Sequence, residues 1–201
     1  MLEGARYWLE KITKYFTFLI LFFFLSSCSS VSSVVSIAAN AGISSKGFSA
    51  SVDDGYLKAK IIGNISTLNI SNIVDVKASV SLGDVLLTGY SGDQLSRLKI
   101  VERVSKINGV KKVYNEIIIN PNVSLKERAE DVIFESRLMT RLLFKSGINS
   151  NNYSLDVVGG TVYAIGLAEN LDEKNKVEKF LGKMGDIPKL VTIINLKNNK
   201  D

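Results

Sequence analysis

Two stretches of this chain match each other at a fixed offset of 77 residues. The segment GDVLLTGY at 83–90 corresponds to GTVYAIGL at 160–167, and upstream the same offset carries Asp54 to Asp131 without a gap. A fixed offset held over such a length indicates the duplication of one supersecondary unit. Units of about 70 residues lie near the lower limit for independent folding, so we expect the two copies to pack against each other.

Each copy predicts the same order of helices and strands. The first predicted helix opens with a capping pattern, Ser51-Val-Asp-Asp54 in one copy and Ser124-Leu-Lys-Glu127 in the other. Alternating apolar residues then predict a strand, with Val74, Val76, Ala78 and Val80 in the first copy and Tyr153, Leu155 and Val157 in the second. A glycine-containing turn and a second strand follow.

A second helix and a last strand complete each copy. The helix is expected to begin near Ser91 or Asn170, with Gln94 or Glu173 as its capping partner. Its apolar positions are Val101, Val104 and Ile107 in the first copy and Val177, Leu181 and Met184 in the second. The strand segments are VYNEIII and LVTIINL. The fold class is therefore α+β, with two αββαβ units that each place a small mixed sheet under two helices.

The N-terminus has the pattern of a signal peptide. Residues 15–25, YFTFLILFFFL, form an apolar run of 11 residues, with Arg6, Lys11 and Lys14 before it and serines after it. A membrane-spanning helix needs about 20 apolar residues, whereas this length is typical of a signal-peptide core. We predict a signal peptide over residues 1–27.

The only cysteine, Cys28, follows this run directly. The stretch Leu25-Ser26-Ser27-Cys28 resembles a bacterial lipobox, which implies that the peptide is cleaved before Cys28 and that this cysteine is acylated. Many lipoproteins that are retained in the inner membrane carry Asp directly after the acylated cysteine. This chain has Ser29 there, which favours the outer membrane. The alternative is a free cysteine in an ordinary signal peptide or short anchor. Residues 28–50, rich in Ser, Ala and Gly, are expected to form the lipidated, flexible tether.

Composition excludes several kinds of chemistry. The chain has no histidine and one cysteine, which removes the usual general base, Cys/His zinc frameworks and an intramolecular disulfide. We expect no enzyme activity, no cofactor and no metal. The net charge is +5, and after Cys28 it is +4 (22 Lys and Arg against 18 Asp and Glu). This mild excess suits an anionic membrane surface, and no nucleic-acid-binding pattern accompanies it.

The repeated motif resembles the BON domain, a family of periplasmic and outer-membrane proteins. The first copy matches the family's glycine pattern with Gly83, Gly89 and the pair Gly109-Val110. The second copy matches it with Gly160 and Gly166, but has Asp186-Ile187-Pro188 where Gly-Val is expected. We expect the four glycines at equivalent positions of the two copies to be turn or strand-end residues with unusual backbone angles; they are Gly83, Gly89, Gly160 and Gly166.

Together with the lipobox, two such units resemble the dual-BON outer-membrane lipoproteins, which include division-site proteins. The resemblance implies BON domains at 51–121 and 122–197 and a short tail at 198–201. It also implies binding of anionic phospholipid and support of envelope integrity, on the periplasmic side of the outer membrane. The alternative is a protein-interaction module that docks on an envelope assembly or division component.

The helix predicted over residues 131–145 offers a candidate lipid contact. At about 100° per residue, a core face is expected from Val132, Leu138, Met139, Leu142 and Leu143. On the opposite side stand Phe134, Arg137, Arg141 and Lys145, a basic stripe with one aromatic ring. Such a stripe suits an anionic bilayer. Two alternatives remain: Phe134 packs against the first unit, or the stripe is a solvated helix face.

Overall fold

The computed structural model describes residues 48–68, 73–184 and 189–197. The first copy holds α3 (Phe48–Ser66), β1 (Ile73–Ser81), β2 (Asp84–Ser91), α4 (Gln94–Ser105), β3 (Lys112–Asn115) and β4 (Ile118–Ile119). The second holds α5 (Leu125–Leu143), the short 3-10 turn η1 (Ser150–Asn152), β5 (Tyr153–Val158), β6 (Thr161–Ala168), α6 (Leu171–Gly182) and β7 (Lys189–Leu196). The predicted signal peptide, Cys28, most of the tether, the tail and the Asp186-Ile187-Pro188 turn lie outside the described residues.

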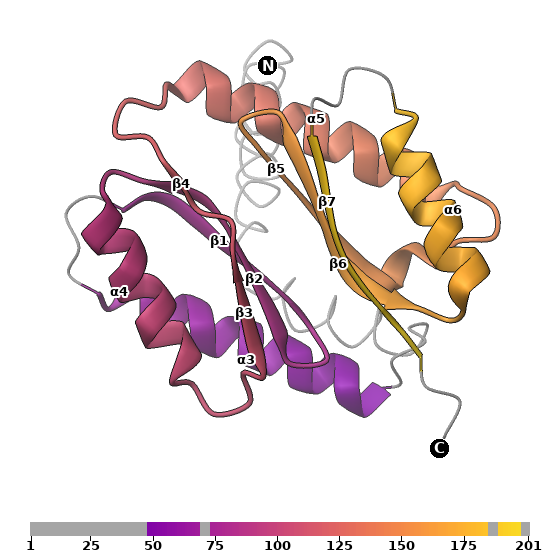
Figure 1. Cartoon of the computed structure of the whole chain (residues 1–201), viewed down its shortest axis with the longest axis horizontal. Coiled ribbons are helices and arrows are strands. Elements are labelled where there is room, and N and C mark those ends of the chain that lie inside the picture. The colour runs from indigo at the N-terminus through magenta and orange to yellow at the C-terminus, as the bar shows by residue number, and fades with distance from the viewer. Residues whose placement is uncertain (1–47, 69–72, 185–188, 198–201) are drawn as a thin grey trace, which may run out of the picture. The chain divides into compact units, whose positions relative to one another are not determined.

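The two copies repeat one topology, as the duplication predicts (Figure 1). In the first sheet β2 pairs antiparallel with β1 and parallel with β3 and β4. In the second sheet β6 pairs antiparallel with β5 and parallel with β7. The fold class is therefore α+β with mixed sheets. The last strand of the first copy, predicted as one segment, is split into β3 and β4.

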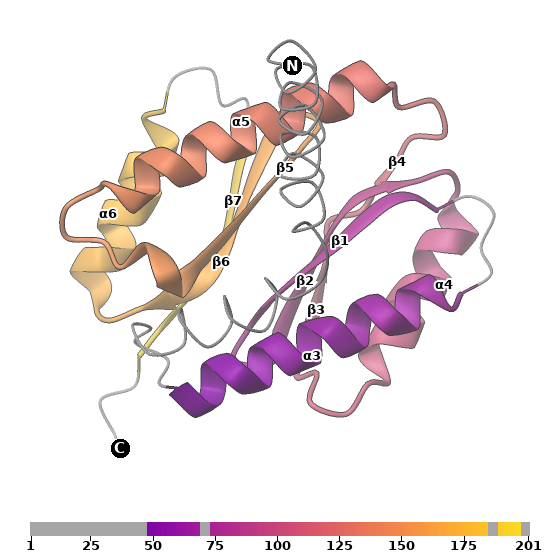
Figure 2. The same cartoon turned by 180° about the vertical axis from the view of Figure 1, so that it is seen from behind.

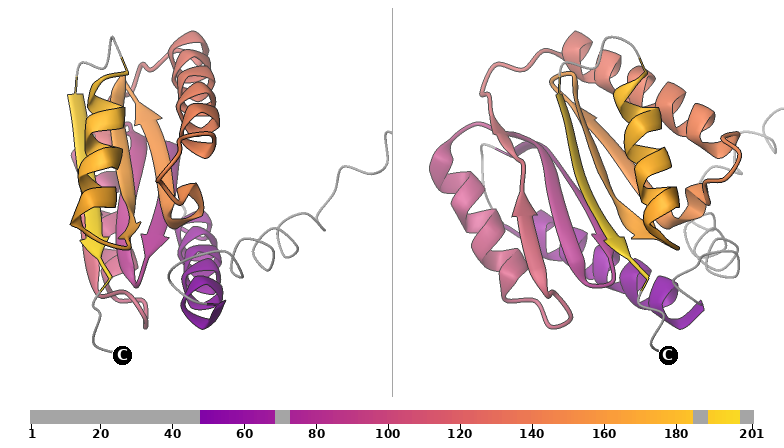
Figure 3. Two further views of the ribbon diagram at one scale, coloured as in Figure 1. Left: turned by 90° about the vertical axis from the view of Figure 1, so that its right-hand side faces the viewer. Right: turned by 45° about the vertical axis from the view of Figure 1, so that its right-hand side comes forward.

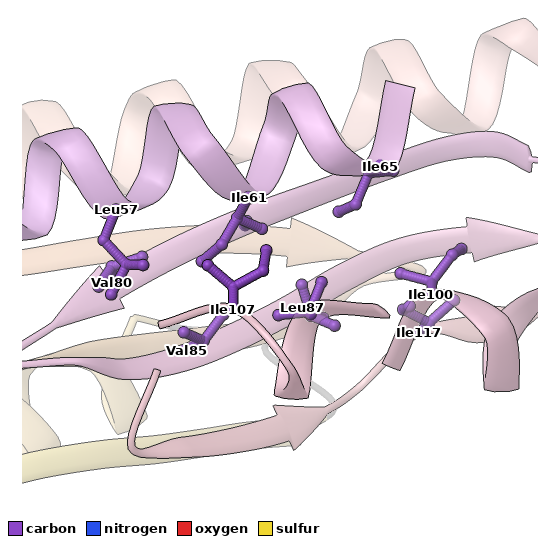
Figure 4. Close-up of a cluster of buried hydrophobic side chains, with 11 residues drawn as sticks. Leu57, Ile61, Ile65, Val80, Val85, Leu87, Ile100, Ile107 and Ile117 are labelled. Carbon is purple, nitrogen blue, oxygen red and sulfur yellow. The ribbon is translucent and has the colours of Figure 1, made fainter. Parts of the chain in front are cut away.

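Each sheet buries one face under its own two helices. Figure 4 shows the first core, where Leu57 and Ile61 of α3 meet Val80, Leu87 and other apolar side chains. In the second copy α5 and α6 cover one face of their sheet (Figures 2 and 3), and the core there includes Leu138, Leu142 and Val177. The predicted apolar positions of strands and second helices lie in these two cores wherever their side chains are described.

The other faces of the two sheets share a third apolar cluster. It is made of Leu86, Tyr90, Val158, Tyr163, Ile165 and Ile193, with Tyr114, Ile118, Val123 and Val191 at its margin. Because β2 and β6 lie in the middle of their sheets and contribute to a cluster on each face, nearly all their residues are buried. The two copies thus pack against each other, as expected for units of this size.

Polar contacts cross the same interface. The hydroxyl of Ser79 donates to Asp156 at 3.0 Å, and Lys77 forms an ion pair with Glu135 at 2.8 Å. Ser79 and Asp156 are equivalent positions, 77 residues apart. Contact between equivalent residues, together with reciprocal contacts of β1 with β6 and β2 with β5, is the pattern of a local two-fold axis. Burial, and then the neighbouring charge of Glu135, raises the pKa of Asp156 above its ordinary value.

Helix starts agree with the sequence in the second copy and differ in the first. Ser124 and Glu127 form the predicted capping box of α5, and the backbone N–H of Ser124 lowers the pKa of the Glu127 carboxyl. The cap predicted at Ser51 is wrong, because α3 already begins at Phe48. The start predicted near Ser91 is also wrong: Ser91 ends β2, and the N-cap of α4 is Asp93.

Asp54 has another role, which its counterpart repeats. The carboxylate of Asp54 accepts hydrogen bonds from the backbone N–H groups of Leu82 and Gly83, at 2.8 and 3.1 Å. Asp131 accepts the equivalent bonds from Gly159 and Gly160, at 2.9 and 3.1 Å. Each aspartate therefore ties the first helix of its copy to the turn between the first two strands.

The strand glycines are needed for close approach of the backbone. A Cβ at Gly89 would lie 1.9 Å from the carbonyl oxygen of Asp75, and one at Gly166 would lie 2.5 Å from that of Asn152. Asp75 and Asn152 are again 77 residues apart. Gly89 has a φ of +106°, as predicted, whereas Gly166 is not among the positive-φ glycines, so the prediction of unusual angles is wrong for Gly166.

Candidate functional site

The inner face of α5 is fixed by its role in the fold. Asp131 must point at the hairpin turn that it caps, and Leu138 and Leu142 follow it at seven and eleven residues on the same side. All three are buried. Phe134 and Met139 border this line and pack, partly buried, against the second core.

This orientation corrects the predicted core face. Val132 and Leu143, predicted to be core residues, are 54% and 58% exposed. Phe134, predicted to project among the cations, instead packs against the core of its own copy. The helix is rotated from the predicted orientation because a buried polar residue, Asp131, belongs to the inner face, and apolar periodicity alone gave it no weight.

The outer side of α5 carries an apolar stripe, which we call the α5 face. Its members are Leu125, Val132, Ile133, Leu143 and Phe144, each at least half exposed. Phe144 is the most exposed of them, at 81%. From Leu125 to Leu143 the stripe is about 27 Å long at 1.5 Å per residue. These residues were missed as site residues because their spacing placed Val132 and Leu143 on the predicted core face.

Exposed cations border the α5 face. Arg137, Arg141 and Lys145 are exposed, as predicted. Their contacts are weak ones: an Arg141 Nη1 lies 3.7 Å from the sulfur of Met184, and the Lys145 ammonium lies 5.6 Å from the ring centre of Phe180. Among the described residues none of the three cations forms an ion pair, so their charge stays available to an external anion.

The equivalent surface of the first copy is poorer in apolar and basic side chains, although Tyr56 stands at the position of Ile133. The positions of Val132, Leu143 and Phe144 are taken there by Gly55, Ser66 and Thr67. Arg141 and Lys145 are replaced by Asn64 and Leu68, and Arg137 by Lys60. Since the two copies share one fold, the apolar and basic surface of α5 is an addition that the fold itself does not require.

Metal binding and membrane crossing find no support in the described part of the chain. Over the described residues, no cluster of three carboxylate or sulfur side chains could hold a metal ion. Across the same part of the chain, no helix combines the length and apolar character that crossing a bilayer demands.

Comparison with known proteins agrees with the repeated motif. Residues 53–121 match the model of the BON domain family. The chain is a BON-domain protein. An uncharacterized protein from the gshII 5′ region of Anaplasma centrale is 34% identical to it over 151 residues, covering 74% of this chain and 98% of that protein. The two belong to one family.

Solved structures similar to this BON-domain protein include two of CdsD, a structural protein of the type III secretion system of Chlamydia trachomatis. One is 16% identical and covers 69% of this chain and 92% of that one, with a TM-score of 0.28. The other, of the C-terminal domain, is 15% identical and covers 71% and 98%, also with a TM-score of 0.28.

Proposed function

We propose that this BON-domain protein is a lipid-anchored protein of the outer membrane, facing the periplasm, that binds anionic phospholipid and supports envelope integrity. The binding unit is the second αββαβ unit, which we propose to be a second BON domain. Attachment at acylated Cys28 is part of the proposal and predicts a mature chain that starts with a modified cysteine. Mass spectrometry of the N-terminus tests it, and an intact Met1 or cleavage elsewhere contradicts it.

The α5 face is the observation that carries the proposal. An apolar stripe bordered by cations is the surface with which a helix lies in the interface of an anionic bilayer. Full burial of one such side chain is worth roughly 1.5–3 kcal/mol, so completing the burial of the five members, each at least half exposed, contributes at least about 4 kcal/mol. Three cations near the surface add about 1 kcal/mol each.

These contributions sum to about 7 kcal/mol before the entropic cost of association. That is modest for a free protein. It becomes sufficient when the lipid anchor already holds the domain near the bilayer, because the effective concentration is then high. The original four-residue prediction is thereby revised: Arg137, Arg141 and Lys145 stay in the proposed site, and Phe144 with Leu143 takes the place of Phe134.

Liposome co-sedimentation of the chain from Ser29 onward tests this function. We expect binding to vesicles that contain phosphatidylglycerol and little binding to pure phosphatidylcholine, with salt weakening the former. The double reversal Arg137→Glu/Arg141→Glu changes four charges, about 4 kcal/mol, and should weaken binding by several hundredfold. Leu143→Ser/Phe144→Ser should weaken binding at both low and high salt.

The matched control is Lys60→Glu/Lys99→Glu, which makes the same change in net charge on exposed positions of the first copy. It should bind like the parent chain. If the Arg137/Arg141 reversal binds like the parent, the α5 face is not the membrane contact. If the parent chain does not bind anionic vesicles but binds one defined envelope protein through the α5 face, the protein-interaction alternative is correct.

A further inference from the structure

A basic groove lies between the C-terminal end of α5 and the helix α6. It has a volume of about 460 Å³ and is lined by Lys145, Ser146, Lys176, Lys179, Phe180, Lys183 and Met184. Four of these seven residues are lysines and none is acidic. Like charges gathered in one concavity repel one another, and a bound anion would relieve that repulsion.

Side-chain contacts show how the walls of the groove are held. The ammonium of Lys145 lies over the ring of Phe180, within the range of a cation–π contact. Lys176 lies against the turn after α5, where a Cβ at Gly147 would come within 3.4 Å of its ammonium. Lys176 also pairs with Asp172 at 2.7 Å, whereas within the described residues Lys145, Lys179 and Lys183 form no ion pair.

The first copy shows what α6 would look like without this groove. The positions of Lys176, Lys179 and Lys183 are occupied on α4 by Lys99, Glu102 and Lys106. There Glu102 pairs with Lys106 at 2.6 Å, which balances the charge along that face. In the second copy the acid is replaced by Lys179, and Leu68 is replaced by Lys145. The excess of positive charge is therefore specific to the second copy.

We propose that this groove binds the phosphate group of an anionic phospholipid headgroup. The inference rests on the proposed function, which it deepens with a defined headgroup site. A lipid source is favoured over soluble phosphate because Lys145 directly follows Phe144, the most exposed apolar side chain of the α5 face. A bilayer that meets the α5 face would bring its headgroups to this end of the helix.

Residue-resolved lysine labelling of the full chain in nanodiscs tests the site. Reductive methylation is followed at each lysine by mass spectrometry, in phosphatidylcholine discs and in discs that also contain phosphatidylglycerol. We expect slower labelling of Lys145, Lys179 and Lys183 in the anionic discs only. Lys60 and Lys99 of the first copy serve as internal references, and Lys126, an exposed lysine of α5, reports membrane contact of the helix itself.

The variant Lys179→Glu sharpens the test. It places at this position the residue that α4 carries at its equivalent, so the fold is expected to accept it. The new carboxylate should pair with Lys183 as Glu102 pairs with Lys106. The change of two charges, about 2 kcal/mol, should weaken the apparent affinity of the groove for phosphatidylglycerol by roughly 30-fold, measured as lost protection of Lys145 and Lys183. Lys99→Glu is the matched control and should leave protection unchanged.

Each outcome separates the groove from the α5 face. Protection of Lys126 without protection of the groove lysines refutes the groove and leaves the proposed function standing. Protection of the groove lysines without Lys126 refutes membrane contact by α5 and keeps the headgroup site. If neither Lys126 nor the groove lysines are protected, both the headgroup site in the groove and the membrane contact of α5 are refuted. If inorganic phosphate protects the groove lysines equally well on phosphatidylcholine discs, the ligand is a soluble phosphate and the lipid proposal is wrong. If polyglutamate alone protects them, the ligand is an acidic protein segment and the lipid proposal is again wrong.

Discussion

Replacing Asp131 by alanine should strongly destabilise the fold. Its carboxylate accepts three hydrogen bonds: from the backbone N–H groups of Gly159 and Gly160, and from the hydroxyl of Tyr90 at 2.9 Å. A hydrogen bond to a charged group contributes about 1.5 kcal/mol or more, so we expect Asp131→Ala to cost about 4.5 kcal/mol. Much of a small domain's stability would then be lost.

The duplication supplies a matched comparison. Asp54 makes the same two bonds to its hairpin turn, but the counterpart of Tyr90 is Leu167, which has no hydroxyl. Loss of these two bonds in Asp54→Ala should therefore cost about 3 kcal/mol, whereas the tyrosine bond between the two copies belongs to Asp131. Burial, and then the hydrogen bond to Asp131, raises the pKa of Tyr90 to about 12, so this bond persists up to alkaline pH.

A double-mutant cycle isolates that bond. Tyr90→Phe should cost about 1.5 kcal/mol in the parent chain and close to nothing when Asp131 is already alanine. The assay is urea unfolding of the full chain in a neutral nonionic detergent, followed by circular dichroism. A coupling energy below about 0.5 kcal/mol would show that Asp131 does not link the two copies in the way described.

Two further predictions concern backbone approach and the buried carboxylate at the interface. Gly89→Ala should lower the free energy of unfolding by at least about 3 kcal/mol, because its Cβ would lie 1.9 Å from the Asp75 carbonyl oxygen. Gly63→Ala, in open space on α3, should instead raise the free energy of unfolding by roughly 0.5–1 kcal/mol. Similar effects of the two changes in urea unfolding would contradict the close approach. The pKa of Asp156 is raised first by burial and then by Glu135, so the unfolded chain releases this proton at lower pH than the folded one. The contribution of Asp156 to folding stability therefore falls as pH rises above about 3.8, and Asp156→Asn should remove that loss. Unfolding free energies of both chains between pH 3 and 7 check this, and a stability difference that does not change with pH would be inconsistent with the raised pKa.

The sequence by itself determined the architecture of each copy. The 77-residue offset predicted two units of one topology, and the alternation of Val76, Ala78 and Val80 predicted which face of β1 meets the helices. The capping box at Ser124 placed the start of α5 correctly. These features are local, since they depend on spacing along the chain and on hydrogen bonds between residues a few positions apart.

Tertiary structure decided which side of α5 faces inward. The apolar residues of the helix spread over one broad arc, and spacing alone could not show which part of it faces inward. The choice follows from Asp131, whose carboxylate is held by a turn 28 residues away, and this turns Leu138 inward and Leu143 outward. Burial of the second face of each sheet is likewise non-local, because Leu86 and Tyr163 lie in a cluster to which both copies contribute. Periodicity shows that a residue could be buried, but the partner that buries it is found only in the folded chain.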